Sequence, residues 1–187
     1  RYCSHRFMTL QRMPAAEVPI DATLVRALLQ EQHEDLSSLP LVEAGEGWDN
    51  KLFRLGDELL VRLPRRQMAA ALVEHEQRWL PTLAPHLPLP VPTPVRVGRR
   101  GCGFPWSWSV VPWFAGECAL IQPPRDLASA AADLGAFLRS LHQPAPADVQ
   151  ANPWRASLES RTPLMIERLQ RLDGIVDRAA VVALWDR

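Results

Sequence analysis

The sequence lacks the features that mark secreted, membrane-spanning or nucleic-acid-binding proteins. Its three cysteines, Cys3, Cys102 and Cys118, form no C-x-x-C pair, and an odd number makes no complete disulfide framework. The 21 basic and 21 acidic residues balance to a net charge of zero, which argues against a surface for nucleic acid or an anionic membrane. No apolar run approaches the roughly 20 residues that span a bilayer, and the N-terminus lacks the apolar core of a signal peptide. We therefore predict a cytoplasmic protein without a nucleic-acid or membrane partner.

Proline, in contrast, is abundant. The 18 prolines gather mainly at residues 81–94, 112, 123–124 and 144–163. These clusters mark connections, because proline ends helices and removes a backbone donor. The chain of 187 residues, 47% of them hydrophobic, is long enough for one large or two small domains.

Apolar periodicity predicts a mixed chain with five strands. Apolar residues at helical spacing follow Asp21, a residue type that caps helix N-termini, as far as about Gln32. Strands are predicted at residues 39–44, 52–55, 59–63, 94–98 and 104–111. Helices are predicted at residues 67–83, 127–141, about 163–172 and about 177–187.

The stretch between the first two strands is rich in glycine and polar residues. It contains Gly45, Gly47, Trp48, Asp49 and Asn50. Glycine has no Cβ, so its backbone N–H groups can approach a phosphate closely. The alternative is a plain hairpin turn, because the pattern G-x-G alone is a weak motif. Trp48, large and apolar at the tip, would either fold over the loop or touch substrate.

The third strand and the following helix each place one charge in an apolar setting. The period of two puts Leu60 and Arg62 on the same face of the strand. The helix carries an apolar stripe: Leu72, Trp79, Leu80 and Leu83. Glu76 falls within this stripe, and a buried carboxylate needs a partner. We therefore predict an ion pair between Arg62 and Glu76, and this cation favours a phosphate cradle at the glycine loop.

Four strings of residues together indicate a family. They are G-W-D-N, R-L-G-D-E-L-L-V-R-L-P-R-R, E-x-x-W-L and W-S-V-V-P-W-F-A-G-E. From about Val18 to the C-terminus the chain resembles the aminoglycoside phosphotransferase family, whose fold is protein-kinase-like. The resemblance implies an α+β fold: a five-stranded antiparallel small lobe with one main helix, then the first helices of an α-helical large lobe.

The resemblance also implies a division of the chain and a set of binding residues. Residues 1–19 form an arm, 20–111 the small nucleotide-binding lobe, 112–118 a hinge, and 119–187 the incomplete start of the large lobe. The implied nucleotide-binding residues are Gly45, Gly47, Trp48, Asp49, Asn50, Arg62, Glu76, Trp113, Phe114 and Ala115. Pro112 has no N–H, so hinge donors to the base must come from residues 113–115.

One residue departs from the pattern of the wider kinase relatives. They carry lysine where Arg62 stands, whereas the only lysine of this chain, Lys51, follows the glycine loop. Arginine can still pair with Glu76 and with phosphate oxygens, although as a rigid fork and not as a point charge.

The catalytic machinery of such an enzyme is missing from the sequence. A kinase-like enzyme needs an Asp for the acceptor hydroxyl, an Asn five residues later and a further metal-binding Asp. No histidine here is followed by Gly-Asp, and no Asp is followed by Asn five residues later. We interpret the chain as a truncated sequence that ends before the catalytic loop, and we assign it no catalytic residue and no metal ligand.

The resemblance implies a kinase that uses ATP or GTP with Mg²⁺, whose metal ligands would lie in the missing C-terminal part. The acceptor would be a hydroxyl of a small molecule, either an aminoglycoside or a related metabolite. This chain alone is expected to be inactive. The alternative is a non-catalytic remnant or interaction module that keeps the kinase-like small lobe.

Overall fold

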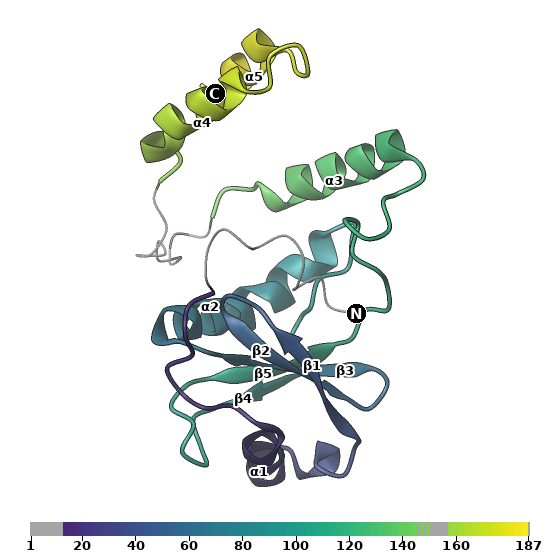
Figure 1. The fold of residues 1–187 in the computed structure, drawn as a ribbon, viewed down its shortest axis with the longest axis vertical. Helices are drawn as coiled ribbons and strands as arrows, with labels where there is room; N and C mark the ends of the chain where they lie inside the picture. Colours follow the sequence, from purple (N-terminus) through teal and green to yellow (C-terminus); the bar gives the residue numbers. More distant parts are fainter. Residues whose placement is uncertain (1–12, 146, 148, 150–156, 187) are drawn as a thin grey trace. The chain divides into compact units, whose positions relative to one another are not determined.

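The computed structural model describes residues 13–145, 147, 149 and 157–186. The chain divides into two compact units, Arg1–Pro144 and Ala145–Arg187 (Figure 1). The first unit contains α1 (Ala22–Gln32), η1 (Glu34–Leu36), β1 (Leu41–Glu46), β2 (Asn50–Leu55), β3 (Leu59–Pro64), α2 (Gln67–Leu83), η2 (Ala84–His86), β4 (Arg96–Gly98), β5 (Trp108–Pro112) and α3 (Leu127–Leu141). The second contains η3 (Glu159–Arg161), α4 (Thr162–Gln170) and α5 (Arg178–Trp185). None of the described helices is long and apolar enough to cross a membrane.

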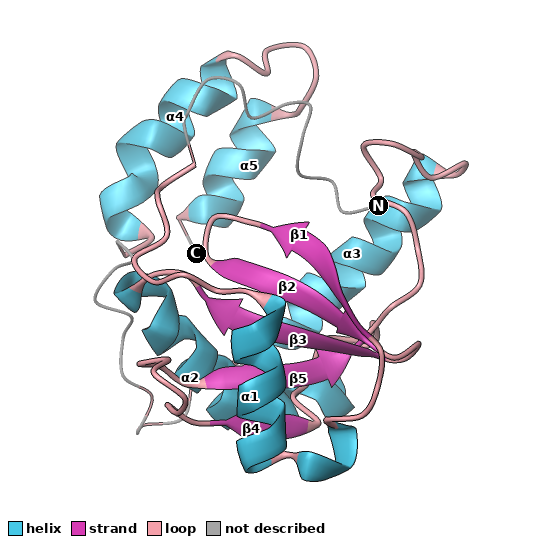
Figure 2. Ribbon diagram, turned by 60° about the horizontal axis from the view of Figure 1, so that its bottom comes forward, coloured by secondary structure: helices cyan, strands magenta, loops and turns pink. Residues whose placement is uncertain are grey.

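The five strands form one antiparallel sheet in the order β1-β2-β3-β5-β4 (Figure 2). The predicted five-stranded sheet is therefore confirmed, with shifted strand ends. The fourth and fifth strands are shorter than predicted. β1 runs two residues further than predicted, and β2 begins two residues earlier. Hydrogen bonding between the two strands continues almost to the tip of the hairpin, so only residues 47–49 connect them.

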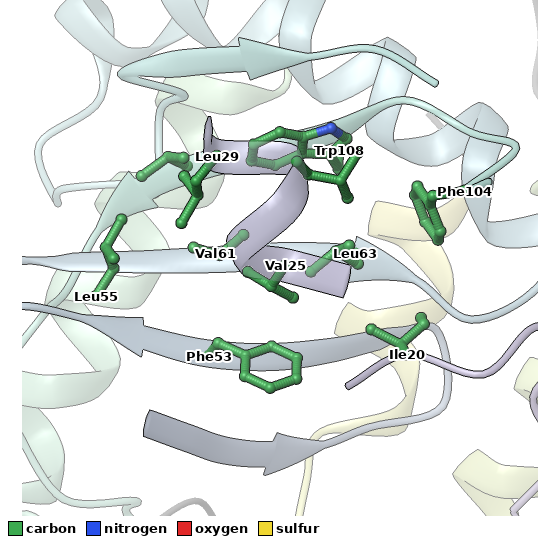
Figure 3. Packing of buried hydrophobic residues seen from close by; sticks show 11 residues of the cluster. Ile20, Val25, Leu29, Phe53, Leu55, Val61, Leu63, Phe104 and Trp108 are labelled. Carbon is green, nitrogen blue, oxygen red and sulfur yellow. The ribbon is translucent and has the colours of Figure 1, made fainter. Parts of the chain in front are cut away.

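The main core lies on the face of the sheet that α1 covers (Figure 3). Asp21 caps α1 as predicted, because its side chain accepts a hydrogen bond from the Leu24 N–H at 2.8 Å. The strand period of two sends alternate side chains into this core. Its buried members are Ile20, Val25, Leu28, Leu29, Phe53, Leu55, Val61, Leu63, Phe104, Trp108 and Val110.

Helix α2 has the bounds predicted for it, but a different face is buried. The buried residues are Ala69, Ala70 and Val73. The predicted stripe of Leu72, Trp79, Leu80 and Leu83 is only half-buried. Small side chains let the helix approach the sheet closely, and the side chain of Gln77 donates to Trp108 O at 2.8 Å and Ser109 Oγ at 3.0 Å. The larger apolar residues therefore lie at the flank of the contact.

The described part of the predicted arm contacts the lobe. The Glu17 N–H donates to Arg65 O at 2.9 Å, and the Glu17 carboxylate accepts from the Gln67 N–H at 2.9 Å. This bond satisfies one of the open donors at the start of α2. Residues 1–12 of the arm lie outside the described residues.

The three later helices are formed close to the predicted positions. In the second unit, Leu169 is buried and the indole of Trp185 donates to Thr162 Oγ1 at 3.0 Å. A groove of about 300 Å³ runs between α4 and α5, lined mainly by apolar side chains.

The close approach of β4 to β5 yields a first prediction. A Cβ on Gly98 would lie 2.0 Å from Cε2 of Trp108, whose side chain is fully buried. Gly98→Ala should therefore lower the free energy of unfolding by about 1–3 kcal/mol, the usual cost of overpacking. Urea unfolding followed by tryptophan fluorescence measures it. Gly135→Ala in α3, where an added Cβ meets nothing within 4 Å, is the control and should be neutral or stabilising. Equal midpoints for Gly98→Ala and wild type would contradict the packing.

A second prediction concerns His33, which packs edge-on against Trp108 at a centroid distance of 5.4 Å. Burial lowers the pKa of His33 from its usual value of 6.5, and the positive charge of Arg96 lowers it further. A hydrogen bond to the backbone of Val97 and the negative charge of Asp35 oppose this shift. Just below pH 6.5 the unfolded chain binds a proton that the folded chain does not. The free energy of unfolding should therefore rise with pH in this window. Above pH 6.5 His33 is neutral in both states and does not lower the free energy of unfolding. As the pH falls from 6.5 toward the lowered pKa, the free energy of unfolding decreases.

The measurement is the slope of unfolding free energy against pH, in wild type and in His33→Gln. Carboxylates titrate mostly below about pH 5, so they contribute little in the chosen window. The slope should be smaller in the variant, and equal slopes would show that His33 is not the group responsible.

Candidate functional site

Arg62 and Glu76 form the predicted ion pair. Arg62 lies on β3 and Glu76 on α2, with NH1 2.9 Å from Oε2 and NH2 3.3 Å from Oε1. The arrangement is bidentate, which fixes the plane of the guanidinium group. The Arg62 side chain is 16% exposed and that of Glu76 34%. The predicted ion pair is thus confirmed, although Glu76 is more open to solvent than a buried stripe would make it.

The glycine stretch is only partly a loop. Gly45 lies within β1 at a β-bulge, where its φ of 128° is strained for other residues, and Asn50 begins β2. Gly47, Trp48 and Asp49 form the connection. A Cβ on Gly47 would meet nothing within 4 Å. Gly45 is therefore required by the backbone itself, whereas the structure leaves room for a side chain at Gly47.

A small apolar cluster lies on the same face of the sheet as Arg62. Its buried members are Leu52, Leu60 and Val111, with Ala44 and Trp113 packed against them. Leu52 is paired with Arg62 across the strands, so the cluster adjoins the cation. Sequence reasoning placed Leu60 on the Arg62 face but did not identify a cluster. The available signal was the alternation in β3, whereas Leu52 and Val111 needed the strand register.

The predicted hinge donors differ in availability. The Trp113 N–H donates to Glu58 O at 2.7 Å and so extends the pairing of β5 with β3. The Trp113 N–H is therefore used within the sheet, which narrows the predicted hinge donors of residues 113–115 to Phe114 and Ala115. The indole of Trp113 instead stacks under the Arg54 guanidinium, at 4.8 Å from ring centroid to Cζ. Phe114 and Ala115 follow as exposed residues.

Two arginines that sequence reasoning did not single out contact the connection between β1 and β2. Arg65 donates from NH1 to Gly47 O at 3.0 Å, and Arg66 donates from NH2 to Asp49 Oδ1 at 3.0 Å. The pattern of the sequence gave no partner for either arginine. Their contacts span 17 and 18 residues and depend on the hairpin register.

One histidine followed by x-Asp is present, at His33-Glu34-Asp35. This segment caps the end of α1, and Asp35 forms an exposed ion pair with Arg96 at 3.2 Å. The neighbouring core residues place it on the α1 side of the sheet, away from the face of Arg62. It is therefore a structural segment and not a catalytic loop.

Within the described residues, no group of three or more histidine, cysteine, aspartate or glutamate side chains could hold a metal ion. The site consists of a cation fixed by a carboxylate, an adjoining apolar cluster and a glycine connection at the end of the same strands. Such an arrangement can bind a ligand that has an anionic part and an apolar ring.

Comparisons with known proteins support a family assignment. The model of a family described as the phosphotransferase enzyme family matches residues 40–186. A search of curated proteins found no match.

Solved structures with a similar fold include two aminoglycoside-type enzymes and one macrolide-type enzyme. Wild-type aminoglycoside 2'-phosphotransferase-IIIa in complex with GDP has a TM-score of 0.62 at 16% identity, over 89% of this chain and 58% of that one. The GDP and kanamycin complex of APH(2")-IIia has a TM-score of 0.57 at 19% identity, over 84% and 55%. Macrolide 2'-phosphotransferase type I has a TM-score of 0.50 at 22% identity, over 93% and 60%. The matches therefore cover between 55% and 60% of these structures, and at such identities the likeness shows the fold.

Proposed function

Because the chain belongs to the phosphotransferase enzyme family, we propose that it forms the nucleotide-binding part of a small-molecule kinase. The reaction would transfer the terminal phosphate of ATP or GTP to a hydroxyl group of the acceptor. The observation that carries the proposal is the bidentate pair of Arg62 and Glu76, on the face of the sheet that also bears the apolar cluster.

Arg62 would hold the phosphates. Its guanidinium group has five N–H donors, and the Glu76 carboxylate accepts from two of its nitrogens. The group can therefore bind phosphate oxygens while Glu76 holds its plane. In this role Glu76 orients the cation and does not itself touch the nucleotide.

The connection between β1 and β2 would cover the phosphates. Gly47 leaves open space where a Cβ would stand, so a phosphate can approach the backbone there. Gly45, Asp49 and Asn50 would shape the connection, and Trp48 would lie at its tip. A plain hairpin turn remains the competing interpretation of this segment.

The base would pack at the apolar cluster, against the half-buried Ala44 and Trp113. Its polar edge would meet the backbone after β5, where Phe114 and Ala115 supply the N–H groups that the sheet does not use. Cytoplasmic ATP or GTP are both compatible with such backbone contacts.

The acceptor is proposed as a class. One similar structure is a complex with GDP and kanamycin, and another is a macrolide 2'-phosphotransferase. We propose an aminoglycoside-like compound or a related hydroxyl-bearing metabolite. The described residues offer no carboxylate cluster for Mg²⁺, so no step is assigned to a metal here, and this chain alone is expected to bind nucleotide without transferring phosphate.

Gly47→Val tests the cradle. A Cβ added at Gly47 meets nothing within 4 Å, so the fold should be kept while the approach of a phosphate is blocked. Titration with ATP and with GTP should show at least a tenfold weaker affinity, or about 1.4 kcal/mol. Unchanged nucleotide affinity in a folded variant would show that residues 47–49 only connect β1 and β2.

Glu76→Gln tests the orientation of Arg62. The substitution keeps the shape of the side chain but removes the charge, so the dissociation constant for nucleotide should rise by about three- to tenfold. The melting temperature should change by only a few degrees, because a partly exposed ion pair contributes at most about 1 kcal/mol.

Glu43→Gln is the matched control, since it breaks the Lys51–Glu43 pair between β1 and β2, whose N–O distance is 3.1 Å. Its nucleotide affinity should equal that of wild type. A similar loss of affinity in the two variants would argue against a specific role for Glu76.

A further inference from the structure

We propose that Arg65 and Arg66 are positioning residues that hold residues 47–49 in the shape that receives the phosphates. The inference rests on the proposed function and adds to it two residues that bind no ligand themselves. Both follow β3 directly and reach back across the sheet to the hairpin of β1 and β2.

Arg65 is a buried cation, only 5% exposed. Its Nε lies 3.2 Å from Glu46 Oε2, an ion-pair distance without hydrogen-bond geometry, and its NH1 donates to Gly47 O at 3.0 Å. A buried guanidinium group costs several kcal/mol unless partners compensate it. Folding of the lobe therefore requires Glu46 and the Gly47 carbonyl to stay beside Arg65.

Arg66 holds the other side of the connection. Its NH2 donates to Asp49 Oδ1 at 3.0 Å and, more weakly, to Trp48 O at 3.4 Å. The backbone N–H of Arg65 donates to Asp49 O at 2.8 Å. The carbonyl oxygens of all three connecting residues thus accept hydrogen bonds from Arg65 or Arg66.

This arrangement sets the direction of a backbone donor. In a planar trans peptide the C=O of one residue and the N–H of the next point in opposite directions. Gly47 O is held by Arg65, so the Trp48 N–H points away from Arg65. Leu63 faces the α1 core, and the strand alternation puts Arg65 on that side, opposite Arg62. The Trp48 N–H is therefore directed to the face that carries Arg62.

The segment that carries the two arginines is itself anchored. Glu17 accepts from the Gln67 N–H and donates its own N–H to Arg65 O, both at 2.9 Å. Arg65 contacts Glu46 and the Gly47 carbonyl, and Arg66 contacts Asp49 and the Trp48 carbonyl, whereas Nε of each has no hydrogen-bond partner. The contacts that the two arginines make are with the connection, so we infer that they act on a phosphate through it.

The test compares ligands with and without phosphate. In Arg66→Gln, the dissociation constants for ATP and GTP should rise by about five- to tenfold, whereas those for adenosine and guanosine should stay unchanged. Arg65→Lys keeps the charge but cannot reach two acceptors at once, so it should show the same selective loss if it folds. The double variant Arg66→Asp, Asp49→Arg restores the ion pair with its partners exchanged. It should bind triphosphates more tightly than Arg66→Asp alone.

Arg96→Gln is the control, because it breaks an ion pair of 3.2 Å on the same lobe, far from the connection in sequence. It should bind triphosphates like wild type. Equal losses for nucleosides and triphosphates, or no loss in Arg66→Gln, would overturn the proposal.

Failure of the proposed function has a different signature, since wild type would then bind neither triphosphates nor nucleosides. In that case hydrogen exchange of the Gly47 amide, which donates to Asn50 O at 2.9 Å, decides whether the arginines hold the connection. Faster exchange in Arg66→Gln than in Arg96→Gln supports the positioning, and equal exchange overturns it.

Discussion

The ion pair between Arg62 and Glu76 joins the centre of the sheet to α2, and the site depends on it. β3 lies between β2 and β5, so a cation on it has strands on both sides and a helix above. The pair is partly exposed and contributes little to stability. The bidentate geometry does more for orientation than for folding, because it fixes a flat group whose remaining donors can face a ligand.

The same alternation that buries one face of the sheet builds the site on the other. In β3, Val61 and Leu63 enter the core under α1, which leaves Leu60 and Arg62 on the face toward α2. A shift of one residue in register would exchange these faces and bury the cation. The core and the site are therefore specified together, and the large apolar core stabilises the position of Arg62.

The parts of the fold and of the site that depend on local sequence pattern could be predicted from the sequence. The bounds of α2, the cap at Asp21 and the face of β3 that carries Arg62 follow from local pattern. Glu76 does pair with Arg62, although the apolar stripe from which its burial was predicted is only half-buried. The buried face of α2 was predicted wrongly, because close packing on a sheet selects Ala69 and Ala70 over larger side chains. The loss of the Trp113 donor and the apolar cluster around Leu52 depend on strand register, which no local pattern contains.

Arg62, Arg65 and Arg66 make different contacts, because β3 ends between Arg62 and the other two. Arg62 is inside β3 and points to the face of the apolar cluster. Pro64 closes the strand, Arg65 continues the alternation onto the α1 side, and Arg66 turns into the N-cap position of α2. Arginine suits all three places, since each guanidinium group contacts a carboxylate and the two after the strand also meet carbonyl groups. Lysine, as a point charge, would keep the attraction but lose the fixed plane.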